Sequence, residues 1–281
     1  MNRTRRTIAG IIAACTIAPT VAFAMTGGEP DGNRHPNVGM IAFYQDGTRY
    51  RCSATLVSPT VVLTAAHCTL GTAGKTIVTF ETFIAAVPPS GIPVAAIPAA
   101  GFTAADVTDK RFVTGTAHTH PQYSDFTDMN NWNDVGVVVL DAPLTTIAPA
   151  KIAPSGYLNQ FAQPKLNSTL FTIVGYGTEV RKPDSGPQKP TPQSYPLIRR
   201  FADAPGQKLT PQILQVNGNP NDIRGTGGSC FGDSGGPTFK NNKVVTVTSY
   251  GYTLNCRYLD GLQRVDIPVV QSWLAGFGVR P

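Results

Sequence analysis

The stretch Gly228-Ser229-Cys230-Phe231-Gly232-Asp233-Ser234-Gly235-Gly236-Pro237 carries most of the information on how this chain folds. Its glycines and its proline surround Ser234 and predict a sharp turn, because glycine has no Cβ and tolerates positive φ. Such a turn directs the amide N–H groups of Gly232 and Ser234 to one point while it exposes the serine hydroxyl. A nucleophile and an oxyanion hole require this arrangement. For the stretch alone, a glycine-rich loop with an incidental serine is the alternative interpretation.

Two further motifs supply the groups that a serine nucleophile needs. A serine hydroxyl requires a base to take its proton, and that base requires a carboxylate to orient it. Upstream, an apolar run starting at Val61 ends at His67, and Asp134 enters a second apolar run that extends to Leu140. The order His, Asp, Ser differs from the order Ser, Asp, His of the α/β-hydrolase esterases. The order of the motifs therefore favours a peptidase over such an esterase.

Together, the three motifs resemble those of chymotrypsin-fold (trypsin-like) serine peptidases, in particular secreted bacterial ones. The matching segments are Thr64–Cys68, Asn133–Leu140 and Gly232–Pro237. The resemblance implies an all-β fold of two antiparallel six-stranded Greek-key barrels with a C-terminal helix and the active site in the cleft between the barrels. It also implies a serine endopeptidase that works through an acyl-enzyme. The resemblance assigns the catalytic triad to His67, Asp134 and Ser234, and the oxyanion hole to the N–H groups of Gly232 and Ser234. The alternative is a homologue that binds without catalysis. Such homologues usually lose a triad residue or the oxyanion glycine, and this sequence has all of them.

Composition agrees with a turn-rich β protein. The chain has 281 residues, of which 41% are hydrophobic, 28 are glycine and 24 are proline. We expect a peptidase domain over 25–281, with one barrel over about 25–145 and the other over about 146–281. A helix is expected near Pro268–Phe277. Strands are expected over Met40–Tyr44, Tyr50–Val57, Val61–Ala65, Phe171–Gly177, Val244–Tyr250 and Leu262–Val265.

Residues 1–24 have the pattern of a secretory signal peptide. Arginines come first, a mostly apolar run follows, and Ala22-Phe23-Ala24 is a small-x-small cleavage site. The run is short for a membrane span. We therefore expect a secreted or periplasmic protein, or alternatively one that is lipid-anchored through Cys15. Because residues 1–24 hold three arginines and no acidic residue, cleavage lowers the formal charge from +6 to +3. This charge is too small to indicate nucleic-acid binding.

Without Cys15, four cysteines remain. The resemblance implies that they form the disulfides Cys52–Cys68 and Cys230–Cys256. None of the four has the short CxxC spacing that zinc sites favour. We expect no cofactor and no metal, a protein or peptide as substrate, no stable association with a membrane, and a monomer.

The resemblance also bears on activation. Met25-Thr26-Gly27-Gly28 stands where the family's liberated N-terminus would be, and in that family the new α-ammonium pairs with the Asp before the catalytic serine, here Asp233. The expected signal cleavage directly precedes Met25. The hypothesis is that signal peptidase itself makes the activating cut. Met-Thr departs from the family's two hydrophobic residues at this point.

The substrate pocket is also inferred from the resemblance, with Gly228 at its base, Ser229 beside it, and Ser249-Tyr250-Gly251 as one wall. A neutral base favours an apolar or aromatic side chain before the scissile bond. The alternative is a preference for Lys or Arg if Asp260, rather than Gly261, points inward. Because side chains alternate along a strand, a shift of one residue decides between these two.

Other polar or aromatic residues have less specific patterns. His118 and His120 lack the flanking pattern of a catalytic histidine, and we favour a structural role for both. Trp132 is expected to pack over the loop that carries Asp134. The proline-rich segment 182–196 is expected to be a surface loop.

Overall fold

The computed structural model describes residues 25–180 and 193–281. The expected signal peptide, the alternative lipid site at Cys15, and the larger part of the proline-rich segment lie outside these residues.

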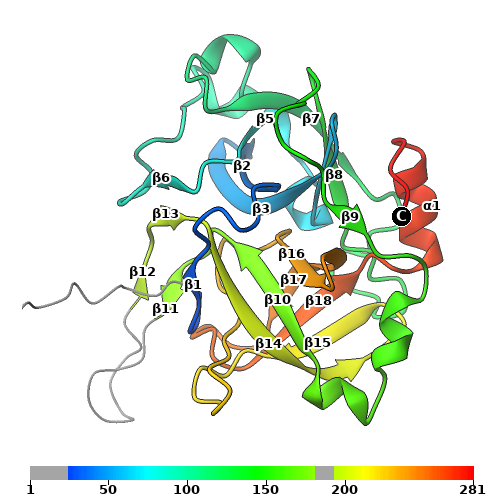
Figure 1. The fold of residues 1–281 in the computed structure, drawn as a ribbon. Helices are drawn as coiled ribbons and strands as arrows, with labels where there is room; N and C mark the ends of the chain where they lie inside the picture. Colours follow the sequence, from blue (N-terminus) through cyan, green and yellow to red (C-terminus); the bar gives the residue numbers. More distant parts are fainter. Residues whose placement is uncertain (1–24, 181–192) are drawn as a thin grey trace, which may run out of the picture.

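The first barrel contains six antiparallel strands, which close in the order β2-β3-β4-β8-β7-β5 (Figure 1). Asp46 and Gly47 both have positive φ, at 49° and 72°, and together they form the two-residue turn between β2 and β3. Positive φ at both central residues is typical of the tightest β-hairpins. The strands are β2 (Val38–Gln45), β3 (Thr48–Ser58), β4 (Val61–Thr64), β5 (Ala73–Thr79), β7 (Val113–Thr119) and β8 (Gly136–Leu140).

The second barrel also closes through six antiparallel strands, in the order β14-β10-β16-β17-β18-β15, with β15 pairing back to β14. The two barrels lie one above the other in Figure 1, with α1 at one side. This architecture confirms the fold expected from the sequence. The strands are β10 (Leu170–Gly175), β14 (Arg200–Leu209), β15 (Ile213–Asn217), β16 (Pro237–Lys240), β17 (Lys243–Gly251) and β18 (Leu259–Arg264).

Short elements connect and flank the barrels. β1 extends the second barrel beside β14, and β6 pairs with β13, so two pairings join segments that are far apart in the sequence. The one α-helix in the described parts of the chain, α1 (Pro268–Ala275), lies within the expected range. The remaining elements are β1 (Glu29–Pro30), η1 (Ala66–Cys68), β6 (Phe83–Ala85), η2 (Pro98–Ala100), η3 (Ala104–Asp106), β9 (Lys151–Ile152), η4 (Tyr157–Phe161), η5 (Lys165–Ser168), β11 (Glu179–Val180), β12 (Gln193–Ser194) and β13 (Leu197–Ile198).

One apolar cluster holds the two barrels together. It joins Leu63 and Val137 of the first barrel to Val174 and Val247 of the second, and Leu274 of α1 completes it. All of these side chains are buried, and burying one aliphatic side chain stabilises a fold by about 1.5–3 kcal/mol. The cluster therefore fixes how the barrels face each other, and with that the positions of the loops between them.

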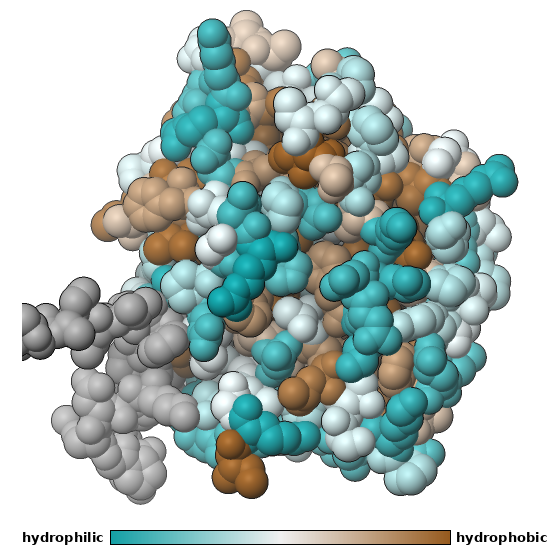
Figure 2. Space-filling model, viewed as in Figure 1, coloured by the Kyte–Doolittle hydropathy of each residue, from teal (hydrophilic) through white to brown (hydrophobic). Residues whose placement is uncertain are grey.

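The described cysteines form two disulfides, Cys52–Cys68 in the first barrel and Cys230–Cys256 in the second, as expected. Among the described helices, none is long and apolar enough to cross a membrane. On the face in Figure 2, hydrophilic and hydrophobic side chains are interspersed.

Candidate active site

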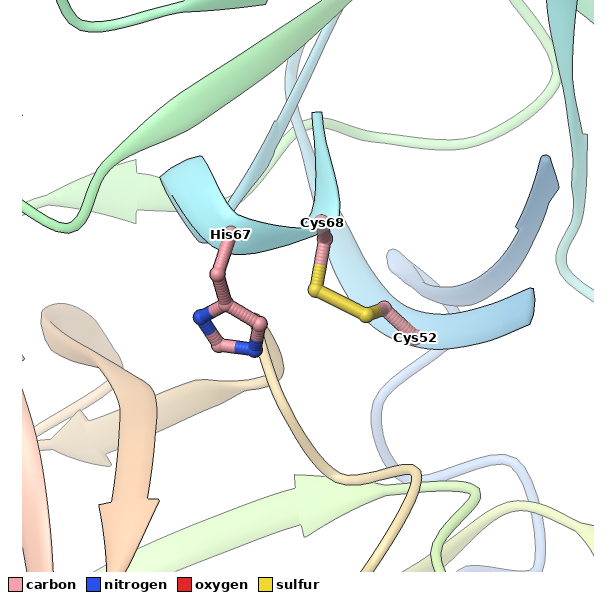
Figure 3. Close-up of side chains that lie close together, drawn as sticks. All are labelled: Cys52, His67 and Cys68. Atoms are coloured by element: carbon pink, nitrogen blue, oxygen red, sulfur yellow. A yellow bond between two sulfur atoms is a disulfide. The ribbon is translucent and has the colours of Figure 1, made fainter. Parts of the chain in front are cut away.

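His67 lies in the short helix η1, directly after β4 has crossed the first barrel. All residues of β4 are buried in the barrel. His67 follows the end of this strand and is partly exposed. The Cys52–Cys68 disulfide ties the residue after His67 to β3, and Figure 3 shows the imidazole beside this bond. The disulfide restrains the backbone that carries the histidine.

Asp134 holds His67 by two hydrogen bonds. The backbone N–H of His67 donates to Oδ1 of Asp134 at 2.9 Å, and Nδ1 of His67 lies 2.8 Å from Oδ2. Asp134 is fully buried, and Ser249 Oγ also donates to Oδ2, at 2.6 Å. A carboxylate that accepts from Nδ1–H leaves Nε2 of the imidazole as a free acceptor. The geometry therefore presents His67 as a base.

The Ser234 loop adopts a tight turn over residues 230–233. The N–H of Asp233 donates to the carbonyl of Cys230 at 2.9 Å, and Gly232, third in the turn, has a φ of 98°. Positive φ at that position is the signature of a type II turn, in which the central peptide is reversed relative to type I. Ser53 Oγ donates to the carbonyl of Gly232 at 2.9 Å. This contact holds the turn against the first barrel.

The residues that follow the turn are inserted between the barrels. Ser53 N–H donates to the Ser234 carbonyl at 2.8 Å, and Gly235 N–H donates to the Thr248 carbonyl at 2.8 Å. A Cβ on Gly235 would lie 2.0 Å from Oγ1 of Thr64, three residues before His67. Only glycine fits this position. The loop that carries Ser234 is thus clamped to β3 and β4 on one side and β17 on the other.

Asp233 is fully buried beneath the turn. Its carboxylate accepts the N–H of Gly177 at 2.7 Å and that of Cys230 at 2.9 Å. Burial raises the pKa of Asp233 to about 7, although these amides and the charges of Arg51 and Arg200 oppose the shift. A Cβ on Gly177 would lie 2.1 Å from Oδ2 of Asp233. The glycine therefore makes room for the carboxyl group.

A cavity of about 270 Å³ opens beside Ser234. Of the expected pocket residues, Ser229, Ser249, Tyr250, Gly251 and Asp260 line it. Gly228 supports its base, since a Cβ there would lie 2.7 Å from Oδ2 of Asp260. Gly261 lies under the ring of Tyr250 instead, where a Cβ would be 2.2 Å from the nearest ring carbon.

Asp260 is 3% exposed and points its carboxylate between Gly228 and Gly251. Its Oδ2 accepts the N–H of Ser229 at 2.7 Å. Burial raises the pKa of Asp260 to about 7, and the negative charge of Asp233 adds to that shift. The carboxyl group is therefore poised to gain or lose its proton near neutral pH.

Comparison with known proteins agrees with this geometry. The trypsin family model matches residues 26–274. A trypsin of Saccharopolyspora erythraea is 30% identical over 232 residues, which cover 81% of this chain and 86% of that protein. The chain belongs to the trypsin family. It is a serine endopeptidase, and it hydrolyses peptide bonds.

Other relatives of this trypsin-family chain are more distant. Brachyurin of Leptuca pugilator is 28% identical, over 77% of this chain and 83% of its own length. The solved structure of HL collagenase has a TM-score of 0.61 at 18% identity, and it covers 92% of this chain and 98% of that one. Human heparin binding protein has a TM-score of 0.59 at 15% identity, over 92% and 98%. These last two likenesses show the fold alone.

The first described residues of this trypsin-family chain lie against the second barrel. Met25 is fully buried in that barrel's core. Thr26 and Gly228 exchange backbone hydrogen bonds of 3.2 and 3.0 Å. Residue 25 thus lies within the barrel that carries Asp233.

A cluster that looks like a metal site by composition is not one. The ligand atoms of Cys52, His67 and Cys68 lie within 4.8 Å of one another. Both sulfurs are bonded to each other (Figure 3), so neither is a thiolate that could bind a metal. The ring of His118 lies 5.4 Å from that of Phe277, which follows α1, and the ring of His120 lies 5.0 Å from that of Trp273 in α1.

Several residues of the site were not predicted. Ser53 and Arg51 of β3 support the Ser234 turn, and Arg51 Nη1 donates to the Tyr176 carbonyl at 2.8 Å. Gln263 accepts the N–H of Asp134 at 3.0 Å. Phe126 lies over His67, with 5.6 Å between ring centroids. None of these four side chains has a local sequence signal. Only Tyr176, whose carbonyl accepts from Arg51, is marked in the sequence, by a glycine on either side.

Proposed function

We propose that His67, Asp134 and Ser234 form the catalytic triad of this endopeptidase and that the N–H groups of Gly232 and Ser234 form its oxyanion hole. The observation that carries the proposal is the pair of hydrogen bonds by which Asp134 orients His67, at 2.9 and 2.8 Å. The clamped turn before Ser234 supports it.

In the proposed reaction, Nε2 of His67 takes the proton of Ser234 as Oγ attacks the peptide carbonyl. The two amides stabilise the oxyanion of the tetrahedral intermediate, and Asp134 stabilises the imidazolium. His67 then protonates the leaving amine, which departs and leaves an acyl-enzyme. Water, deprotonated by His67, hydrolyses that ester and regenerates Ser234.

Replacing Ser234 with Ala tests this assignment. We expect kcat to fall by about four to six orders of magnitude, because the nucleophile is lost. Ser168→Ala is the matched control, since Ser168 is exposed and lies outside the site. Cleavage of a peptide library, read by mass spectrometry, gives both the rate and the cut positions. A Ser234→Ala protein that retains more than a hundredth of the wild-type rate contradicts the proposal.

We further propose that Asp260 gives the pocket a preference for Lys or Arg before the scissile bond. The sequence favoured an apolar residue. The cavity lined by both Ser234 and Asp260 supports the basic alternative, and so does the position of Gly261 beneath Tyr250. A bound cation would stabilise the ionised carboxylate and lower its pKa. When Asp260 is protonated, below about pH 7, apolar residues should compete better.

We propose that the protein is exported as a monomer and that cleavage after Ala24 activates it. The burial of Met25 and the pairing of Thr26 with Gly228 support a mature chain whose first residue is held inside the second barrel. Mass spectrometry of the secreted protein should find Met25 as the first residue, and acetylation of its amine should abolish activity. A different first residue, or full activity after acetylation, contradicts this idea.

A further inference from the structure

Trp132 makes a polar contact that its expected packing role does not explain. Its indole Nε1–H donates to Oγ of Ser249 at 2.9 Å, and Ser249 Oγ in turn donates to Oδ2 of Asp134 at 2.6 Å. Trp132 and Asp134 lie on the loop before β8, whereas Ser249 lies in β17, so the contact between Trp132 and Ser249 joins residues 117 positions apart. The three residues form a continuous relay that ends on the carboxylate beside His67.

The relay has only one possible direction. An indole N–H can donate but cannot accept, and a serine hydroxyl has a single hydrogen. Since Ser249 Oγ accepts from Trp132, its hydrogen is directed to Asp134. Trp132 is 6% exposed, Ser249 is 4% exposed and Asp134 is fully buried, so bulk water has little access to replace any of these partners. The Ser249 hydroxyl therefore accepts from Trp132 and donates to Asp134.

The ring of Trp132 is itself held in place. Its centroid lies 5.2 Å from that of Phe126 and 5.1 Å from that of Tyr250. Phe126 covers His67, and Tyr250 lines the substrate cavity. Trp132 thus packs between the cover of the histidine and the wall of the pocket while its N–H faces Ser249.

We propose that Trp132 is a positioning residue which, through Ser249, holds the carboxylate of Asp134 in the orientation that His67 needs. The proposal rests on the triad proposed above. Asp134 must keep Oδ1 on the backbone N–H of His67 and Oδ2 on Nδ1 at the same time. A third hydrogen bond to the carboxylate, from Ser249 to Oδ2, resists its rotation. The indole makes Ser249 a better donor because linked hydrogen bonds strengthen one another.

Trp132→Phe removes the N–H and keeps an aromatic ring against Phe126 and Tyr250. We expect kcat to fall about three- to tenfold, as for the loss of one hydrogen bond, with KM within about twofold of wild type. The acidic limb of the pH profile of kcat/KM should move to higher pH. When Ser249 donates a weaker hydrogen bond to Asp134, the negative charge of that carboxylate stabilises protonated His67 more strongly. Trp273→Phe is the matched control, since this other tryptophan lies in α1.

A double-mutant cycle with Ser249→Ala separates positioning from packing. If Trp132 acts through Ser249, Trp132→Phe has no further effect once Ser249 is Ala. An unchanged kcat in Trp132→Phe, or a loss of equal size in the Ser249→Ala background, overturns the proposal. Thermal unfolding shows whether each variant is folded.

Two readouts keep this inference separate from the proposed function. If wild type and Ser234→Ala cleave equally slowly, the triad fails. The proton resonance of His67 Nδ1–H can be measured without turnover. Trp132→Phe should shift this resonance and Trp273→Phe should not, and an unshifted resonance in Trp132→Phe overturns the proposal.

Discussion

The second barrel buries two carboxyl groups beside Ser234, and they differ in what surrounds them. Both oxygens of Asp233 accept backbone amides, from Gly177 and Cys230. Asp260 accepts the amide of Ser229 on one oxygen, and its side chain lines the substrate cavity. Burial raises the pKa of both to about 7. The two groups are thus equally buried but differ in their partners: backbone amides occupy both oxygens of Asp233, whereas Asp260 faces a cavity that a ligand can enter.

The partners of each group explain this difference. A carboxyl group whose two oxygens both hold the backbone stabilises the local loop, because removing it leaves buried amides without acceptors. A carboxyl group with an oxygen on a cavity can bind a charged guest instead. Asp233 is thus expected to control whether the enzyme works, and Asp260 to control what it cleaves.

The largest effect is expected for Asp233→Asn. The amide –NH2 that replaces one oxygen cannot accept a hydrogen bond, so either the N–H of Gly177 or that of Cys230 loses its acceptor beneath the turn that contains Gly232. We expect kcat/KM to fall about 100-fold or more for every substrate, because the oxyanion hole is displaced. Steady-state kinetics on an Arg and a Phe peptide measure this loss. A loss confined to the Arg peptide would contradict the comparison.

A smaller and selective effect is expected for Asp260→Asn. At pH 8, where Asp260 is largely ionised, the ratio of kcat/KM for Arg over Phe peptides should fall about 10- to 100-fold, because a charged guest loses its partner. The rate on the Phe peptide should stay within a few-fold of wild type. The same two peptides serve both variants. Equal losses on both peptides would mean that Asp260, like Asp233, acts only through the fold.

The smallest effect concerns stability against pH. Folding raises the pKa of Asp260 from 3.8 to about 7, so between these values this group binds more protons in the native protein than in the unfolded chain. The free energy of unfolding should therefore fall as pH rises from about 4 to about 7 and then level off, by on the order of a few kcal/mol. Urea unfolding at pH 4, 5.5, 7 and 8.5 measures the slope. Asp260→Asn should reduce this slope, and an unchanged slope would contradict the raised pKa.

Much of the fold could be predicted from local patterns. The apolar runs that end at His67 and follow Asp134 became β4 and β8, and the expected strands Met40–Tyr44 and Tyr50–Val57 became the paired strands β2 and β3. By contrast, the long strand β14 was missed. It contains Pro205 and Gly206, which weaken a strand signal, and it forms because β10 and β15 pair with it on either side.

The sequence by itself determined the residue types of the proposed triad and their order, because this chemistry needs a nucleophile, a base and a carboxylate. It also led to the disulfide pairs, through the resemblance that those motifs carry. Only the tertiary structure decided that Asp260 lines the pocket. The pairing of β17 with β18 shifts register between Thr248 and Tyr250, and this sets Asp260 opposite Gly251 and Gly261 opposite Tyr250. A one-residue shift in register moves every side chain to the other face of the strand, and the register is fixed by pairing with the neighbouring strand. The relay from Trp132 to Asp134 likewise exists only once the barrels have packed together.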